Sequence, residues 1–243
     1  MDRSQSGQAA VESALTLPLM IFVVLGTTQL FMLLHGRIMA EYAVYRATRA
    51  GSVNQGNCES MTHAAVATLL PTFARTDSPA KVIAAFTGHR DNSYSMLLDR
   101  WGSPSARTGA IVWLVRKMDR AIAGPIQETF DDKNRGDSRA ELQVDMVFWF
   151  PMRIPFADWV MGRAYLAAFG ALPYTATNPL MPTQTANWGK ESSYLDGTNT
   201  LSEMRARVLR GQYDFPIRTG FRMRFMTPSV QWSTACPNSP SAL

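Results

Sequence analysis

Glu12 is the side chain in the most unusual chemical setting of this sequence, because it stands at the entrance of a long apolar segment. A carboxylate within a membrane costs roughly 2.5–3.5 kcal/mol at a helix centre and less near the edge. A role in the fold is the competing interpretation, since the helix dipole stabilises an anion in the first turn of a helix. Glu12 is therefore the first candidate functional residue.

Other side chains with catalytic potential form no such pattern. The three histidines, His35, His63 and His89, are scattered along the chain. We find no nucleophile elbow, zinc-protease, Walker A or dinucleotide-binding motif in the context that each requires. We therefore predict no catalytic residue, no metal or cofactor site and no small-molecule substrate, and we do not expect an enzyme.

Cys58 and Cys236 are the two cysteines of the chain, too few for a four-ligand zinc site. In an oxidising compartment they could form a disulfide that ties the C-terminal tail to the end of the N-terminal helix. Closing so long a loop is worth roughly 5 kcal/mol in the chain-entropy model. Two free or separately buried cysteines are the alternative, and the sequence leaves both open.

The apolar segment, residues 14–34, contains 21 residues and no charged side chain. As an α-helix it is about 31 Å long, which matches the hydrocarbon thickness of a bilayer. A cleaved secretory signal is the competing interpretation, but its apolar core is normally about 7–15 residues long and ends at an A-x-A-like site. No such site follows, and a helical pattern continues through residues 37–50, so we predict a retained membrane anchor.

Two residues inside this segment bear on helix packing. Pro18 would break a soluble helix, but membrane helices tolerate proline, usually as a kink. Gly26, followed by Thr27 and Thr28, makes a small patch of the kind that mediates helix–helix contacts in lipid. A flexible spot without a partner is the alternative for Gly26.

The string GQAAVESALTLPL around Glu12 resembles the class III signal of type IV prepilins: a short polar leader with a basic residue, a glycine at the cleavage point, and a glutamate five residues later. Within that class it is most similar to the TadE/TadG-like pseudopilins of the tight-adherence (Flp, type IVc) pilus system. The resemblance covers roughly residues 5–52, and the matching residues are Gly7, Gln8, Ala9, Val11, Glu12, Ala14, Leu15, Leu17, Pro18, Leu19 and Gly26. A major Flp pilin is excluded because those subunits are far shorter.

The resemblance implies that a prepilin peptidase cuts after Gly7, so that Gln8 becomes the new N-terminus. The ammonium group of Gln8 and the Glu12 carboxylate of a neighbouring subunit could then pair in low dielectric. Removing one partner of such a pair costs about 3–5 kcal/mol, so only cleaved chains would assemble stably.

The implied function is that of a membrane-anchored minor pilin or pseudopilin, which takes part in assembly of a Tad/Flp-type pilus or secretion apparatus used in adhesion and biofilm formation. Its expected partners are the membrane, the prepilin peptidase, and other pilins or pseudopilins of the system. The alternative is a single-pass membrane-anchored envelope protein that binds another protein and is not part of a pilus.

The sequence contains signals for both orientations of the anchor in the membrane. Arg37, Arg46 and Arg49 follow the apolar segment, whereas Arg3 alone precedes it, which favours a cytoplasmic domain by the positive-inside rule. Against this stand the leader, which resembles one cut on the cytoplasmic side, and the cysteines; long domains also translocate largely regardless of charge. We therefore expect a bacterial inner-membrane protein with a cytoplasmic N-terminus and a periplasmic or extracellular domain.

Positive charge is spread unevenly over the chain, whose formal net charge is +5. Residues 205–224 contain six arginines and one acid, Asp214. A nucleic-acid surface is one interpretation of such a patch, but a solvated or protein-docking face is favoured, and we expect no nucleic-acid partner.

The expected fold class is α+β: a long N-terminal transmembrane and stalk helix, followed by an extracytoplasmic domain with a small antiparallel sheet and several helices. The predicted parts are the leader, residues 1–7, the helix, residues 8–52, and the domain, residues 53–243. Small residues recur at helical spacing along the stalk (Ala40, Ala43, Ala47 and Ala50), and we expect them to pack on the chain's own domain rather than on another subunit. Gly51 is expected to end the helix.

Two strands of the expected sheet follow from alternation of apolar and polar residues. Residues 142–150 predict a half-buried strand that ends at Pro151, and residues 221–225 predict its partner. Residues 61–74 predict a short helix, residues 81–86 are ambiguous between helix and strand, and residues 111–123 predict a strand that runs into a helix. A capping box, residues 200–203, predicts the start of a helix that ends near Arg210, and residues 130–139 and 171–199 predict loops.

Overall fold

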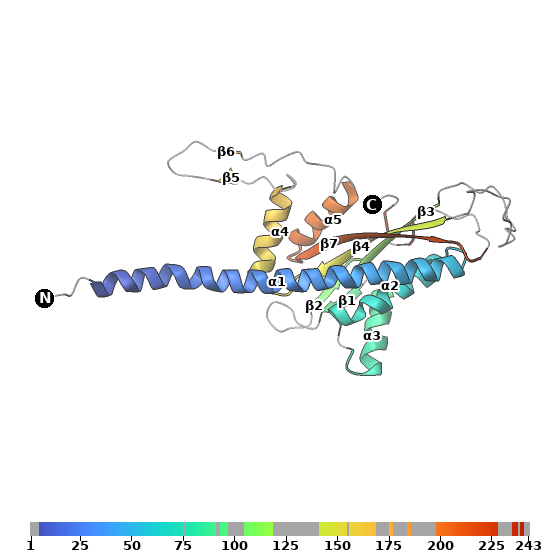
Figure 1. Ribbon diagram of the computed structural model, residues 1–243, viewed down its shortest axis with the longest axis horizontal. Helices are drawn as coiled ribbons and strands as arrows, with labels where there is room; N and C mark the ends of the chain where they lie inside the picture. Colours follow the sequence, from blue (N-terminus) through green and yellow to red (C-terminus); the bar gives the residue numbers. More distant parts are fainter. Residues whose placement is uncertain are drawn as a thin grey trace.

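The computed structural model confirms the α+β class. It describes residues 5–74, 76–90, 93–96, 105–118, 141–154, 156–168, 175–176, 184–185, 198–227, 235–237 and 239–240. The helices are α1 (Gln5–Val53), α2 (Cys58–Phe73), α3 (Pro79–Arg90), α4 (Ala157–Ala168) and α5 (Thr198–Leu209), and Figure 1 shows α1 running along the whole molecule. The predicted loop 130–139, most of the predicted loop 171–199 and the helical end of segment 111–123 lie outside the described residues.

The main sheet is antiparallel and has the strand order β3–β4–β7, formed by β3 (Val112–Met118), β4 (Glu141–Pro151) and β7 (Asp214–Arg224). Both strands predicted from alternation are thereby confirmed as neighbours in one antiparallel sheet, with Leu142 opposite Met223. Two short ladders complete the strands, β1 (Ser93–Met96) with β2 (Ser105–Thr108), and β5 (Thr175–Ala176) with β6 (Gln184–Thr185).

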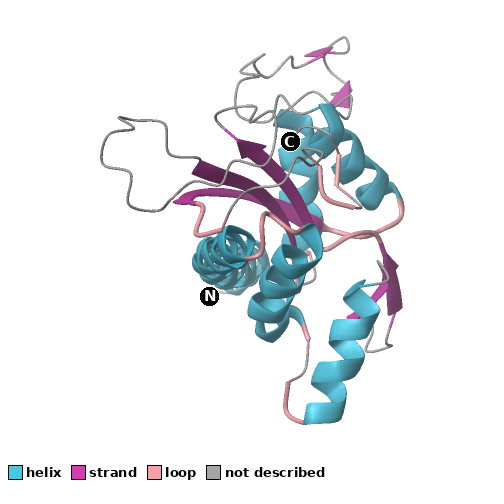
Figure 2. Cartoon of the chain, turned by 90° about the vertical axis from the view of Figure 1, so that its right-hand side faces the viewer, coloured by secondary structure: helices cyan, strands magenta, loops and turns pink. Residues whose placement is uncertain are grey.

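The sheet lies between two helical layers (Figure 2). On one side, alternate β4 residues from Leu142 to Phe150 join the stalk of α1 and the apolar face of α2 in the larger core. On the other side, Trp149 packs beneath α4 and α5 in a second cluster. The prediction of a half-buried β4 therefore holds for its first half only, because α4 and α5 cover the second face where Val147 and Trp149 are both 0% exposed.

The stalk of α1 packs on the chain's own domain, as predicted. Ala40, Ala43 and Ala47 are 0% exposed, because side chains no larger than a methyl group let the sheet and α2 approach the helix closely. Gly36 continues this contact: a Cβ built there would lie 2.5 Å from the Phe150 ring.

The prediction that Gly51 ends α1 is wrong. The helix continues to Val53, and the chain turns where Gln55 and Gly56 take left-handed φ angles of 55° and 74°. Gly51 is needed for packing instead, since a Cβ at this position would lie 2.7 Å from Met61 Sδ. A buried close contact and a helix stop both call for glycine, and sequence alone does not separate them.

The other predicted helices are confirmed with changed boundaries. α2 begins at Cys58 because the Asn57 side chain caps it, accepting a hydrogen bond from Glu59 N at 2.8 Å. The ambiguous segment 81–86 lies in α3 and is helical. The capping box is wrong: α5 starts at Thr198, so Thr200 lies buried inside the helix and Glu203 pairs with Arg207.

Candidate functional site

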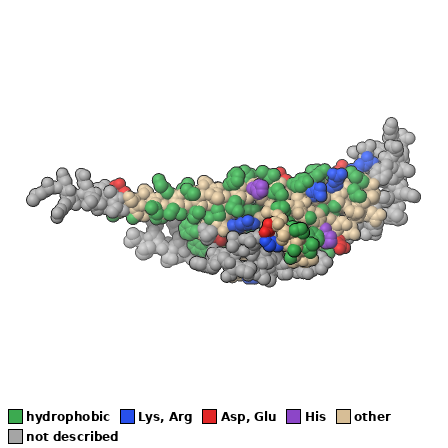
Figure 3. Space-filling model, turned by 90° about the horizontal axis from the view of Figure 1, so that it is seen from below, with side chains coloured by type: hydrophobic (Ala, Val, Ile, Leu, Met, Phe, Trp, Pro, Cys, Tyr) green, Lys and Arg blue, Asp and Glu red, His purple; other side chains and the backbone are tan. Residues whose placement is uncertain are grey.

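The N-terminal half of α1 extends beyond the domain. Residues 11–24 are all exposed along the helix, and most of their side chains are apolar. Val11–Val53 is long and apolar enough to cross a membrane, with a mean hydropathy of 2.1 in its most apolar window and 6% of that window buried. Figure 3 shows this bare helix leaving the domain with hydrophobic side chains on its surface. By length and composition, the chain carries one candidate single-pass anchor in the described residues.

The predicted processing residues lie at the bare end of this helix. Gly7 and Gln8 fall in its first turn, and Glu12 follows one turn later with an exposed side chain. The first four N–H groups of any α-helix have no acceptor within the helix, so the Gly7–Gln8 bond lies in its most easily unwound part. The structure thus brings the three residues onto one short terminal segment.

Pro18 and Gly26 both lie within α1, away from its ends. Pro18 is exposed and does not interrupt the assigned helix. Apart from the neighbouring turns of α1, no atom of the described residues lies within 4 Å of a Cβ built on Gly26, so they supply no contact that requires glycine there. Thr27 and Thr28 bond back to the carbonyls of Val23 and Val24 at 2.9 and 2.8 Å. Packing of Gly26 against another helix remains a prediction.

The domain meets α1 earlier than the apolar segment suggests. Gln29 is 0% exposed, and its Oε1 accepts a hydrogen bond from Ile154 N at 3.0 Å. The rings of Phe22 and Phe156 meet edge to face, with centroids 5.7 Å apart. The apolar segment 14–34 is therefore not bare over its whole length, because the domain contacts it at Phe22 and Gln29. Gln29, the single amide in that segment, is the signal that sequence reasoning missed.

The C-terminal tail is fastened at the opposite end of α1. Cys58 and Cys236 form a disulfide with a Cα–Cα distance of 5.4 Å, so the alternative of two free cysteines does not describe this structure. Cys236 N donates to Leu114 O at 3.2 Å, and Leu114 N donates to Ser239 Oγ at 2.8 Å. The tail therefore lies along the edge of β3 and is covalently tied to the start of α2.

The arginines of residues 205–224 do not form one surface. Arg207 is 0% exposed: its Nε lies 2.9 Å from Glu203 Oε1, its Nη1 lies 2.9 Å from Asp214 Oδ2, and its Nη2 donates to Ala110 O at 2.7 Å. Its guanidinium also lies over the Trp149 ring, 4.3 Å from the centroid. The predicted solvated or docking face is therefore wrong for Arg207, which fastens α5 to the sheet.

A second buried arginine supports the turn after α1. Arg116 on β3 is 5% exposed, and its Nη1 donates to the carbonyl of Gly56. Desolvation by burial lowers the pKa of Arg116 from its ordinary value. This contact fixes the left-handed turn to the edge strand.

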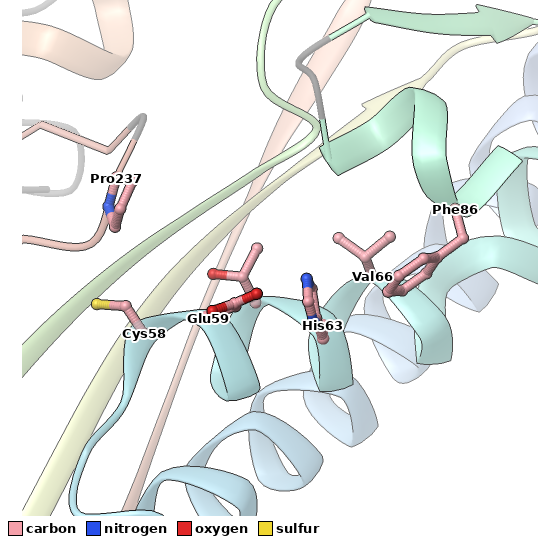
Figure 4. A pocket seen from close by; sticks show the side chains of 7 residues that line it. Cys58, Glu59, His63, Val66, Phe86 and Pro237 are labelled. Atoms are coloured by element: carbon pink, nitrogen blue, oxygen red, sulfur yellow. The ribbon is translucent and has the colours of Figure 1, made fainter.

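A pocket of about 290 Å³ lies beside the disulfide, between α2 and α3 (Figure 4). It is lined by Cys58, Glu59, Thr62, His63, Val66, Phe86 and Pro237. Glu59 and His63 are one helical turn apart on α2, although the three histidines are scattered along the sequence. The Cys58 sulfur is held in the disulfide, and His63 packs edge to face on Phe86. Among the described residues, no group of three His, Cys, Asp or Glu side chains could hold a metal ion.

The fold and the bare helix define a class: an α+β domain carried on one long helix that is compatible with a single-pass membrane anchor. Residues 7–49 match the family of TadE-like proteins, which confirms the resemblance over this part of the chain and is consistent with a TadE-like protein of Tad pilus systems. No curated protein and no solved structure is significantly similar to the chain.

Proposed function

We propose that this chain is a minor pilin or pseudopilin that a prepilin peptidase processes after Gly7 and that then takes part in assembly of a Tad/Flp-type pilus or secretion apparatus. One observation carries the proposal: the segment that matches TadE-like proteins contains a bare apolar half-helix, and the cleavage motif lies in its first turn. An apolar helix face of this length is stable in a bilayer or against other such helices.

Cleavage changes the electrostatics of the bare helix end. Hydrolysis of the Gly7–Gln8 bond leaves an ammonium group on Gln8, four residues before Glu12 on the same helix. In a bundle of such helices, the ammonium of one subunit can neutralise the Glu12 carboxylate of the next. Because an unpaired charge in low dielectric is costly, an assembly of unprocessed chains is disfavoured.

The disulfide supports an extracytoplasmic domain. Disulfides form and persist in oxidising compartments such as the bacterial periplasm and are rare in the cytosol. Cys58 and Cys236 both belong to the domain that follows the anchor. The proposed topology is therefore a cytoplasmic leader, one crossing of the inner membrane, and a periplasmic or pilus-associated domain.

The proposed role is assembly rather than catalysis. The proposed partners are the prepilin peptidase and other pilins or pseudopilins, which would contact the bare helix. We propose neither a nucleic-acid partner nor a small-molecule substrate.

Mass spectrometry of the chain extracted from membranes tests this function. We expect a mature N-terminus at Gln8 in cells that contain the peptidase, and an intact leader in Gly7→Ala. Glu12→Ala should be processed but fail to enter the assembled apparatus. Glu41→Ala is the matched control, because Glu41 is the other glutamate of α1 and pairs with Arg37 on the exposed stalk surface.

The same measurements can refute the proposal. An intact Met1 in membranes that contain an active peptidase would favour a plain envelope anchor that binds another protein. Normal processing and assembly of both Gly7→Ala and Glu12→Ala would also contradict the proposed role of these residues.

A further inference from the structure

The contact between the domain and α1 fixes where the bilayer can lie. The loop before α4 reaches Phe22 and Gln29, and Phe22 precedes the end of the apolar segment at Leu34 by about 18 Å of helix. Irregular backbone exposed to lipid does not occur within the hydrocarbon core. The core must therefore lie toward the N-terminus, and the helix from Gln8 to Gln29, about 32 Å long, is sufficient to cross it.

This placement puts the loop before α4 at the membrane boundary. Gln29 marks the edge of the hydrocarbon, and Phe22 lies about 10 Å deeper along the helix. The Phe156 ring, in contact with Phe22, thus reaches below this edge into the outer part of the acyl chains. Amphipathic segments that lie in this zone are buried to about 5–10 Å, which matches the depth of Phe156.

The backbone of this loop is suited to a region that is poor in water. Ile154 N donates to the Gln29 side chain, and Ile154 O accepts from Asp158 N at 3.0 Å. Phe156 O accepts from Val160 N at 3.0 Å, and Trp159 N donates to Asp158 Oδ1 at 2.6 Å. These groups have partners within the protein, which lowers the cost of placing them near lipid.

Trp159 and Arg163 share one face of α4 by helical spacing, and Phe156 lies one residue before the helix, with a left-handed φ of 71°. Phe156 is 55% exposed and Trp159 is 39% exposed, although both are large and apolar. The Arg163 guanidinium lies over the Trp159 ring, 5.0 Å from its centroid. Trp and Tyr are enriched at membrane interfaces, and Arg side chains there extend to the lipid phosphates.

We propose that Phe156, Trp159 and Arg163 form a lipid-binding foot that rests on the leaflet from which the domain emerges. α4 meets α1 where the helix leaves the domain, so the foot and the anchor enter the same membrane surface (Figure 1). Phe156 and Trp159 contact the boundary of the acyl chains, and Arg163 contacts lipid phosphate. The foot requires only that α1 spans a bilayer, so it does not depend on peptidase processing or on pilus assembly.

Photocrosslinking of the full chain in nanodiscs of phosphatidylethanolamine and phosphatidylglycerol tests the foot. p-Benzoyl-phenylalanine at position 159 should form an adduct with the mass of one phospholipid. The matched control is position 226: Met226 is 51% exposed and lies beside Ser52, about 45 Å along α1 from Phe22. Position 17, on the bare helix, reports whether α1 is in the bilayer at all.

The outcomes distinguish lipid binding by the foot from contact with a second copy of the chain and from non-specific labelling. A lipid adduct at positions 17 and 159 but not at 226 supports the foot. An adduct at position 17 alone overturns it, as does a cross-linked dimer in place of a lipid adduct at position 159, which would show a second copy of the chain on this face. Equal lipid adducts at positions 159 and 226 also overturn it.

Tryptophan quenching gives a second measurement that introduces no crosslinker. Brominated lipids in the same nanodiscs should quench part of the intrinsic fluorescence, and Trp159→Phe should remove most of that lipid-dependent part. Trp113→Phe is the control, since Trp113 is buried in the cluster with Trp149. Unchanged lipid-dependent quenching in Trp159→Phe would overturn the foot even if the crosslinker variants did not fold.

Discussion

Arg207 is the side chain whose removal we expect to cost the most stability. Arg207→Met keeps an unbranched apolar stem but deletes the guanidinium that bonds to Glu203, Asp214 and the carbonyl of Ala110. The Asp214 side chain is 0% exposed, so the variant retains a buried carboxylate that has lost its cationic partner. Breaking one partner of a buried ion pair costs about 3–5 kcal/mol, and we expect a loss of unfolding free energy in this range.

Urea denaturation of the full chain in detergent micelles, with the disulfide intact, measures this loss. Tryptophan fluorescence supplies the signal, and Trp149 reports on this site because the Arg207 guanidinium lies 4.3 Å from its ring centroid. With an m-value of about 2 kcal/mol/M, the expected loss lowers the urea midpoint by about 1.5–2.5 M. The same variant should also shift the tryptophan emission, since the cation over the ring is gone.

Two further variants make the result decisive. Arg205→Met changes an exposed arginine of the same helix in the same way, and surface substitutions of this kind stay within about 0.5 kcal/mol. Arg207→Met combined with Asp214→Leu should recover part of the loss, because the buried carboxylate is then removed together with the guanidinium. If Arg207→Met lowers the midpoint no further than Arg205→Met, the buried network does not hold α5 to the sheet.

Three other substitutions, measured in the same assay, test the packing of α1, the disulfide and the cap of α2. Gly36→Ala should lower stability by about 1–3 kcal/mol, since its Cβ would overlap the Phe150 ring, whereas Gly26→Ala should not; equal effects would contradict the packing assigned to Gly36. Cys58→Ser should lose up to roughly 5 kcal/mol and match the reduced wild type, because the disulfide spans 178 residues; a variant as stable as the oxidised protein would refute its contribution. Asn57→Ala should cost about 1 kcal/mol through loss of the α2 cap, and an unchanged midpoint would show that the cap is dispensable.

The parts of the fold that could be predicted are those with a local period. Ala40, Ala43 and Ala47 recur at helical spacing, and the apolar residues from Leu142 to Phe150 alternate, so a buried helix face and a strand follow from the sequence alone. The proposed cleavage motif around Gly7 is likewise a local pattern, and its processing stays a prediction. Each of these patterns depends on neighbours within a few positions, which a single sequence displays directly.

The parts that could not be predicted depend on residues far apart in the chain. Gln29 is buried by a loop 125 positions later, and Arg207 is buried where α5 packs on Ala110 and Trp149. Before these partners are known, an amide in an apolar segment and an arginine in a basic segment look like ordinary exposed side chains. Gly51 shows the same limit, because Met61 and Leu142 make it a packing residue rather than a helix end.

The shared helix has a mechanical consequence. The C-terminal half of α1 is held by its buried alanines and by the hydrogen bond from Met226 N to Ser52 O. The C-terminal tail, which the disulfide ties to the start of α2, lies next to the end of α1. A pull along the helix axis loads these contacts together in shear instead of opening them one after another. We therefore expect the domain to move together with α1. A displacement of the bare end of α1 along the helix axis should displace the far side of the domain by the same amount.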